Sequence, residues 1–415
     1  MVVSDTDAAT PAGACAAGGA GLDCLFELVD EVDGSCDATR LDHLRTSLSA
    51  RHGSFPVWHQ GRALFVSYGA SVAVAGEFND WQADALSTLQ LCGSDIYLAS
   101  TSIVSGRYSY KVVSGGVWSL DPESWAFAYD EFSGNPDGKN SVLNTYDSGL
   151  GHLVQPEEEV CSTELGNCRP LTTYLPPGYD APANAVRDYP VMFMHDGQNI
   201  FDDKDCCFGH TGWEVNVTLD TEIAAGRVEP VVIVGFDHAY GNRGDEYAYP
   251  VSLGGSQETF MAFQVETVQP TAAGYWRLDG ARYYTGGSSL GGVISFNLAF
   301  NYPNVYAGAA SLSGTFWINE DQNLAIRDLV ESKGSVPVSL YMDHGGTVSG
   351  GGDNIESNMD IIGLLVTTGW QRGDSPSCTE TADSVCYYHD VGASHDELAW
   401  RDRSFRFLRY FFSAK

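Results

Sequence analysis

The second half of the sequence alternates between apolar, strand-like runs and helical stretches. From about Leu171 onward the segments DYPVMFMHDG, EPVVIVGFDH, AGAASLSG and SVPVSLYMDHGG have the character of buried strands. Parallel strands need a long crossover between them, and this crossover is usually a helix. The alternation therefore predicts an α/β fold with a doubly wound sheet.

One strand-to-helix junction in this region carries the pattern Gly-x-Ser-x-Gly, at residues 287–291. The segment ARYYT before it can form a buried strand, and GVISFNLAF after it can form the next helix. In this setting the serine stands on a sharp turn, where neighbouring side chains would block both the turn and the packing of the helix. The pattern alone occurs often by chance, but its setting favours Ser289 as a nucleophile.

A nucleophilic serine of this kind needs an acid and then a histidine further along the chain. His395 follows a strand-like run, and we expect it to take the proton of Ser289 and return it to the leaving group. His344 is a weaker alternative. His389 lies inside the strand-like run and is expected to be an ordinary packed or surface histidine.

Two carboxylates are candidates for the acid. Asp343 ends a strand-like run, and Asp353 lies in the glycine-rich loop that follows it. We favour Asp353, because an orienting carboxylate usually comes from a loop, whereas a residue at a strand end more often anchors the strand.

The loop MHDGQNIFDD follows a strand at the place where an α/β-hydrolase donates its first oxyanion-hole amide. A tetrahedral oxyanion needs two converging backbone N–H groups, and we expect them from Gln198 and Leu290. We expect no metal and no other cofactor, since amides supply the anion stabilisation and no histidine pair or cysteine cluster has ligand spacing.

The ten cysteines and the net charge indicate the compartment and the possible partners of the protein. Cysteines bound the short segments 161–168 and 378–386, which indicates local disulfide loops and an extracytoplasmic, secreted, periplasmic or cell-surface location. Cys206 and Cys207 are adjacent, and either a vicinal disulfide or two separate partners is compatible with the sequence. The net charge of −32 excludes nucleic acid and anionic membranes as partners. No apolar run is long enough to span a membrane.

The first half of the chain has a different organisation. Residues 1–36 are expected to form a cysteine-stapled but irregular arm. A helix is predicted next, with Asp37 as its cap and Gly53 after its end. Short β-branched and aromatic runs with turn residues between them then predict an antiparallel β-sandwich. The expected domains are 1–55 (arm and connector helix), 56–150 (sandwich) and 151–415 (catalytic α/β domain).

Several motifs of the α/β region together resemble the esterase D and enterochelin-esterase family of α/β-hydrolases. The resemblance covers most of residues 155–413 and implies a serine esterase with the triad Ser289, Asp353 and His395. Within these motifs we expect substrate contacts at Asp196, Arg243 and Trp317. The motifs are YLPPGYD, HDGQNIFDD, GWEVN, VIVGFDHAYGNRGDEYAY, GGSSLGGVISFNLAFNYPNVYAGAASLSGTFW and GASHDELAW.

The sandwich region has a resemblance of its own. VAVAGEFNDW, RYSYKVV and WSLDP resemble the immunoglobulin-like sandwich of glycogen-binding-type carbohydrate modules and of enterochelin-esterase-like proteins. This resemblance would make Trp81 and Trp118 sugar-stacking residues that contact a polysaccharide. We favour packing roles for both, in the core or between domains, because aromatic residues in small sandwiches are usually buried.

The function predicted from these patterns is that of a secreted serine carboxylic-ester hydrolase that works through an acyl-enzyme. Neutral aryl, feruloyl, acetyl or polymeric esters are favoured over a catechol siderophore, because the negative charge would repel an anionic iron chelate. Two alternatives stay open: a carbohydrate-binding protein with a degenerate esterase domain, and an acyltransferase of the mycolyltransferase type that uses the same triad with another acceptor.

Overall fold

The computed structural model describes residues 21–130, 138–201, 212–239, 241–249, 255–347 and 352–414. The chain divides into two compact units. Unit 1 comprises Met1–Glu157 with Leu175–Arg187, and unit 2 comprises Glu158–Tyr174 with Asp188–Lys415. The three-part division expected from the sequence stays a prediction.

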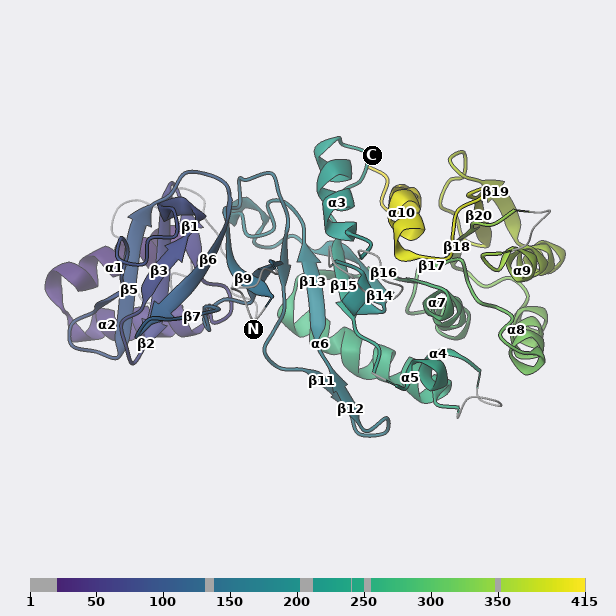
Figure 1. The fold of residues 1–415 in the computed structure, drawn as a ribbon, viewed down its shortest axis with the longest axis horizontal. Coiled ribbons are helices and arrows are strands. Elements are labelled where there is room, and N and C mark those ends of the chain that lie inside the picture. Colours follow the sequence, from purple (N-terminus) through teal and green to yellow (C-terminus); the bar gives the residue numbers. More distant parts are fainter. Residues whose placement is uncertain are drawn as a thin grey trace. The chain divides into compact units, whose positions relative to one another are not determined.

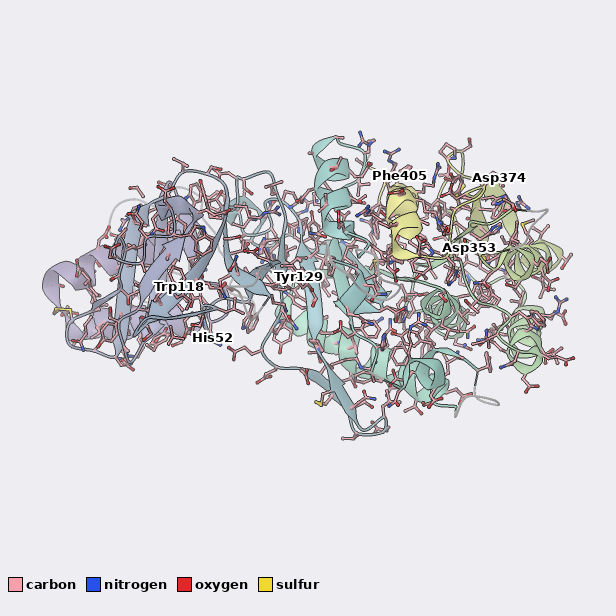
Figure 2. All side chains as sticks on the ribbon, in the orientation of Figure 1. His52, Trp118, Tyr129, Asp353, Asp374 and Phe405 are labelled. Atoms are coloured by element: carbon pink, nitrogen blue, oxygen red, sulfur yellow. A yellow bond between two sulfur atoms is a disulfide. The ribbon has the colours of Figure 1, made fainter. Side chains whose placement is uncertain are left out.

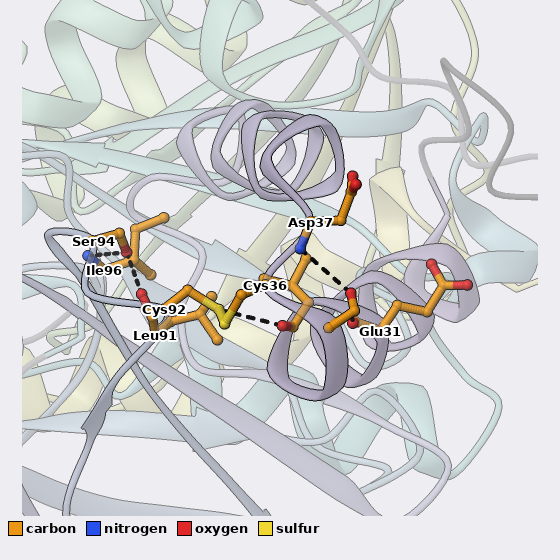
Figure 3. Close-up of a disulfide and its surroundings, with 9 residues drawn as sticks. Glu31, Cys36, Asp37, Leu91, Cys92, Ser94 and Ile96 are labelled. Atoms are coloured by element: carbon orange, nitrogen blue, oxygen red, sulfur yellow. Dashed lines mark hydrogen bonds between the residues drawn. A yellow bond between two sulfur atoms is a disulfide. The ribbon is translucent and has the colours of Figure 1, made fainter.

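The described part of unit 1 begins with the α-helices α1 (Leu22–Ser35) and α2 (Ala38–Ser49). The expectation of an irregular arm is wrong for α1, because its apolar residues recur at helical spacing and are buried. Asp37 caps α2 as predicted, since its carboxylate accepts a hydrogen bond from the Arg40 amide at 2.9 Å. A disulfide joins Cys36, which lies between the two helices, to Cys92 (Figure 3). The buried residues of α1 are Leu22, Leu25, Phe26, Leu28, Val29 and Val32.

The rest of unit 1 is a β-sandwich of antiparallel strands, as predicted (Figure 1). One layer has the order β1-β2-β5-β4, and the other has the order β10-β8-β9-β6-β3 with β7 paired to β6. The short helices are η1 (Glu77–Asn79) and η2 (Pro182–Asn184). The strands are β1 (Val57–His59), β2 (Arg62–Tyr68), β3 (Ala73–Gly76), β4 (Leu89–Gln90), β5 (Ile96–Ser102), β6 (Arg107–Ser114), β7 (Val117–Ser119), β8 (Ala126–Tyr129), β9 (Lys139–Asn144) and β10 (His152–Val154).

Strand β2 shows why the first layer is buried on both faces. Successive side chains of a strand point to opposite faces. Ala63 and Phe65 therefore join the core between the two layers, whereas Leu64 and Val66 pack in a second core with α1 and α2.

Trp81 and Trp118 do not lie in either core. Their exposed fractions are 36% and 44%, and their ring centroids are 6.3 Å apart. The prediction of core packing is therefore wrong for both indoles, and packing between domains stays a prediction. Trp81 lies on a turn with a positive φ of 58°, and Trp118 lies on β7, whose residues are all exposed.

Unit 2 contains a sheet with the order β19-β20-β18-β17-β16-β14-β15-β13. All neighbours in it are parallel except β13, which is antiparallel to β15. This arrangement confirms the predicted α/β fold. The strands are β13 (Leu171–Leu175), β14 (Tyr189–His195), β15 (Val232–Phe236), β16 (Leu278–Ser288), β17 (Gly308–Leu312), β18 (Ser339–His344), β19 (Gln371–Asp374) and β20 (Ser384–His389), and a separate hairpin is formed by β11 (Val160–Ser162) and β12 (Asn167–Arg169).

Helices cover both faces of this sheet (Figure 1). One face carries α3 (Val215–Ala224) and α10 (Glu397–Phe411), and the other carries α7 (Leu290–Asn301), α8 (Glu320–Lys333) and α9 (Ile355–Thr367). The residues of α7, α8 and α9 share one buried apolar core with β17, β18 and β20. The remaining helices are η3 (Gly197–Asn199), α4 (Arg243–Tyr247), α5 (Gln257–Phe263), the π-helix η4 (Gln264–Val268) and α6 (Gln269–Tyr275).

The two local disulfide loops predicted from the sequence are present, as Cys161–Cys168 and Cys378–Cys386. Cys206 and Cys207 lie outside the described residues. Among the helices that the structure describes, none combines the length and the apolar character needed to cross a bilayer.

Candidate active site

Ser289 occupies the turn between β16 and α7, as the pattern predicted. Its φ of 56° and ψ of −123° are strained for a residue with a side chain. The turn is held by the neighbouring strand, because the Ser289 amide donates to the Leu312 carbonyl at 2.9 Å. The Ser289 carbonyl accepts a hydrogen bond from the Thr315 amide at 3.2 Å. The surrounding backbone therefore fixes the position of the serine.

The glycines of the pattern are required by close packing. A Cβ atom on Gly287 would lie 2.8 Å from the backbone of Gly291. A Cβ atom on Gly291 would lie 2.9 Å from a carboxylate oxygen of Asp196. The turn thus packs directly against the loop that follows β14.

His395 and Asp353 form a close polar pair. Nδ1 of His395 and Oδ1 of Asp353 are 2.6 Å apart. The Asp353 side chain is buried, whereas that of His395 is 28% exposed. The ring of His395 also makes an edge contact with Trp400, at a centroid distance of 5.1 Å. Of the two candidate acids, Asp353 is the one that contacts the predicted base.

Asp343 has a different partner. It is fully buried, and its Oδ1 accepts a hydrogen bond from Nε of Arg403 at 3.1 Å. Burial raises the pKa of Asp343 to about 6, against the attraction of Arg403. Nη2 of Arg403 lies 3.6 Å from Oδ2 of Asp353, so this one guanidinium stands between the two carboxylates.

Ser313 connects the same groups. Its hydroxyl donates to Oδ2 of Asp353 at 2.7 Å and accepts hydrogen bonds from Arg403 Nη2 at 2.6 Å and from Trp400 Nε1 at 3.0 Å. The amide of Gly345 also donates to Oδ2 of Asp353. These hydrogen bonds fix the orientation of the Asp353 carboxylate.

Thr315 connects the serine to the acid loop. Its Oγ1 lies 3.0 Å from Oγ of Ser289 and accepts a hydrogen bond from the side-chain amide of Asn354, also at 3.0 Å. Asn354 follows Asp353 directly in the sequence. The chain of contacts therefore joins the predicted nucleophile to the loop of the predicted acid.

The other candidate histidines have structural partners. His344 is fully buried, and its Nε2 lies 2.9 Å from the Tyr387 hydroxyl. Burial lowers the pKa of His344. Nε2 of His389 lies 3.0 Å from the carbonyl oxygen of Gly346. The contact of His389 agrees with the ordinary role expected for it, and Asp353 contacts His395 rather than the alternative base His344.

The two predicted oxyanion-hole amides lie at the ends of neighbouring strands. Gln198 belongs to η3, just after β14, and Leu290 is the first residue of α7, just after β16. Strands β14 and β16 are paired in parallel up to Met194 and Gly286. The first amides of a helix have no carbonyl partner within the helix, so the Leu290 amide suits an anion.

Two of the three residues predicted to contact the substrate form an ion pair with each other. Nε and Nη2 of Arg243 donate to the two carboxylate oxygens of Asp196, each at 2.7 Å. Burial alone would raise the pKa of Asp196, but the attraction of Arg243 outweighs it and lowers the pKa. Trp317 is different: it follows β17 and is 63% exposed. A substrate contact of all three residues stays a prediction.

Four residues that contact the predicted triad or its neighbours were not identified from the sequence: Ser313, Thr315, Asn354 and Arg403. The signal for Arg403 was its spacing, because it lies on the buried face of α10 with Trp400 and Phe407. A charged residue on such a face needs a buried partner.

In the part of the chain that the structure describes, no three His, Cys, Asp or Glu side chains are grouped so that they could hold a metal ion.

Comparison with known proteins shows the family of the chain. A profile of the family described as "Putative esterase" matches residues 162–409. The uncharacterized protein YbbA of Bacillus subtilis (strain 168) is 24% identical over 194 residues, which are 44% of this chain and 71% of YbbA. Ferric enterobactin esterase of Salmonella typhimurium is 16% identical, with a TM-score of 0.47 and coverage of 84% of this chain and 93% of its own. An IroE-like serine hydrolase from Shewanella oneidensis is also 16% identical, with a TM-score of 0.49 and coverage of 63% and 80%.

The matched profile extends over more than half of the sequence, from the β11–β12 hairpin to the last helix. The chain therefore belongs to this esterase family.

Proposed function

We propose that Ser289, Asp353 and His395 are the catalytic triad of a carboxylic-ester hydrolase. The observation that carries this proposal is the 2.6 Å contact between Asp353 and His395, together with Ser289 on its strained turn. With Nδ1 of His395 donating to Asp353, Nε2 is the nitrogen that takes the proton of Ser289. The serine oxygen then attacks the carbonyl carbon of the ester.

The negative charge that develops on the carbonyl oxygen is stabilised by the amides of Gln198 and Leu290. The tetrahedral intermediate collapses when His395 gives its proton to the departing alcohol, which leaves an ester on Ser289. Water then loses a proton to His395 and attacks this acyl-enzyme, and the acid is released with the serine restored.

The preferred substrate is a neutral ester with an aromatic or polymeric part: an aryl, feruloyl or polymeric ester, with small acetyl esters as poorer substrates. Support comes from Trp317, which is 63% exposed and stands two residues after Thr315. An exposed indole offers a flat apolar surface to an aromatic group. The net charge of −32 disfavours anionic substrates.

The test is hydrolysis of p-nitrophenyl butyrate by the wild type and by Ser289→Ala. The variant is expected to lose several orders of magnitude in kcat while its thermal unfolding is unchanged. Ser288→Ala is the matched control, because it removes a hydroxyl from the adjacent residue, and it should retain normal turnover. Near-normal turnover of Ser289→Ala would remove Ser289 from the mechanism.

We also propose that the protein is extracytoplasmic. Support comes from the disulfides Cys36–Cys92, Cys161–Cys168 and Cys378–Cys386, because such bonds persist in oxidising compartments.

A second candidate function is polysaccharide contact by unit 1. It is favoured by the neighbouring, exposed indoles of Trp81 and Trp118. Affinity electrophoresis in soluble starch and in xylan tests it: retardation should be lost in Trp81→Ala and Trp118→Ala. Tyr68→Ala, which removes another exposed aromatic side chain of unit 1, is the control. Equal mobility of wild type and variants with and without polysaccharide would rule the function out.

A further inference from the structure

We propose that unit 2 has a second ligand site, a pocket for a small organic anion that carries two carboxylates on an apolar body. The pocket has a volume of about 770 Å³ and lies against the second half of α10. Four arginines line it: Arg227, Arg282, Arg406 and Arg409. They are a notable share of the 22 basic residues in a chain whose net charge is −32.

The pocket is separate from the candidate active site. Its residue Glu380 accepts hydrogen bonds from Tyr284 at 2.8 Å and from Ser339 at 3.2 Å. Tyr284 and Ser339 pair with the same residue, Gly308, which is the first residue of β17. Ser289, in contrast, follows the carboxyl end of β16. Phe405, which also lines the pocket, projects from α10, whereas Asp353 lies in the loop after β18 (Figure 2).

The first source of positive charge is a pair of arginines that share one carboxylate. Nε and Nη2 of Arg227 donate to Glu222 at 2.8 and 2.9 Å. The same atoms of Arg409 donate to the same carboxylate at 2.7 and 3.0 Å. Among the described residues, these two guanidinium groups therefore share a single carboxylate.

The second source is Arg406. Its guanidinium lies over the Tyr388 ring at 3.6 Å from the centroid, and its Nε is buried without a hydrogen-bond acceptor among the described residues. A buried donor without an acceptor costs free energy, which a bound acceptor would recover. Stacked arginines bind planar carboxylates through two parallel hydrogen bonds.

The other charges of the pocket do not cancel this excess. Arg282 and Glu229 form a pair with each other, at 2.6 Å. The Glu380 carboxylate is engaged by the hydroxyls of Tyr284 and Ser339, and Arg282 attracts it. The positive charge is thus found at two places, Arg406 and the Arg227/Arg409 pair, and a ligand with two anionic groups matches both.

The apolar part of the ligand is inferred from the walls. Pro376, Phe405 and Phe411 line the same pocket. Mixed walls of this kind bind ligands that have an apolar body and a few charged groups. An aromatic dicarboxylate is the simplest probe that meets both requirements.

The test is calorimetric titration of the full-length protein with isophthalate at neutral pH and low salt. We expect saturable binding at one site. Benzoate and inorganic phosphate, which lack the second carboxylate or the apolar body, should bind at least tenfold more weakly. Ser289→Ala should bind isophthalate as the wild type does, which separates this pocket from the active site and from the proposed function.

Arg406→Gln should weaken isophthalate binding at least tenfold. Arg227→Gln, at a more exposed position with less risk to folding, should weaken it severalfold. Arg327→Gln on α8 is the control and should have no effect. No saturable binding of isophthalate by the wild type, or equal affinities in the wild type, Arg406→Gln and Arg227→Gln, would overturn the proposal.

Discussion

Arg403 donates a hydrogen bond from Nε to Asp343 at 3.1 Å, and both side chains are buried. The same guanidinium reaches Ser313, whose hydroxyl donates to Asp353. Asp343 therefore holds the cation, and the cation and Ser313 hold Asp353 in contact with His395. The two aspartates that compete in the sequence for one role have different roles in this arrangement.

Asparagine substitutions separate these roles. Asp353→Asn is expected to lower kcat by about four orders of magnitude, because the imidazole loses the group that fixes its tautomer and charge. Asp343→Asn should lower kcat by less than about tenfold, because asparagine keeps a side-chain oxygen that can accept the hydrogen bond from Nε of Arg403. Kinetics with p-nitrophenyl butyrate, alongside thermal unfolding curves, check both values. The reverse ranking would transfer the role of the acid to Asp343.

Thr315 is expected to position the nucleophile. Thr315→Val keeps the shape of the side chain but removes the hydroxyl that lies 3.0 Å from Ser289 Oγ. We expect a fall of about tenfold in kcat with little change in KM, because the serine oxygen loses its fixed position. Thr315→Ser should restore most of the turnover. A valine variant with normal kcat would show that this contact has no part in the reaction.

Trp317 is expected to select aromatic esters. Trp317→Ala should lower kcat/KM for ethyl ferulate by about tenfold, the value of one lost aromatic contact, and leave p-nitrophenyl acetate nearly unaffected. Leu324→Ala, at an exposed apolar residue of α8, serves as the comparison. Equal losses on the two substrates would contradict a role in specificity.

His195 is expected to make the fold sensitive to acid. Burial lowers its pKa to about 4, and Nε2 lies 2.9 Å from Oε1 of Gln264. Between pH 4 and 6.5 the folded state then binds fewer protons than the unfolded state. The free energy of unfolding therefore falls as the pH is lowered through that range. The loss amounts to about 3 kcal/mol.

Denaturant unfolding of the wild type and of His195→Gln at pH 7 and pH 4.5 measures this contribution. The variant should be less stable than the wild type at pH 7, and its stability should fall less between the two values. Parallel pH dependences would show that His195 does not titrate in this way.

Local patterns in the sequence were sufficient for much of this structure. The alternation of strands and helices gave the α/β fold, because hydrophobic periodicity reports which faces of an element are buried. The glycines around Ser289 predicted the turn, because packing around it leaves no room for a Cβ atom. The cap at Asp37 and the two local disulfide loops were also predictable, because each depends on residues that are close together in the chain.

The tertiary structure decided what depends on distant residues. The sequence could not show that Arg403 separates Asp343 from Asp353, because these residues meet only when α10 packs against the ends of β17 and β18. Nor could it show that Trp81 and Trp118 are exposed, since the same aromatic residue is buried or exposed according to which surface the remaining chain covers. Periodicity identifies an apolar face, but only the packed fold determines what that face meets.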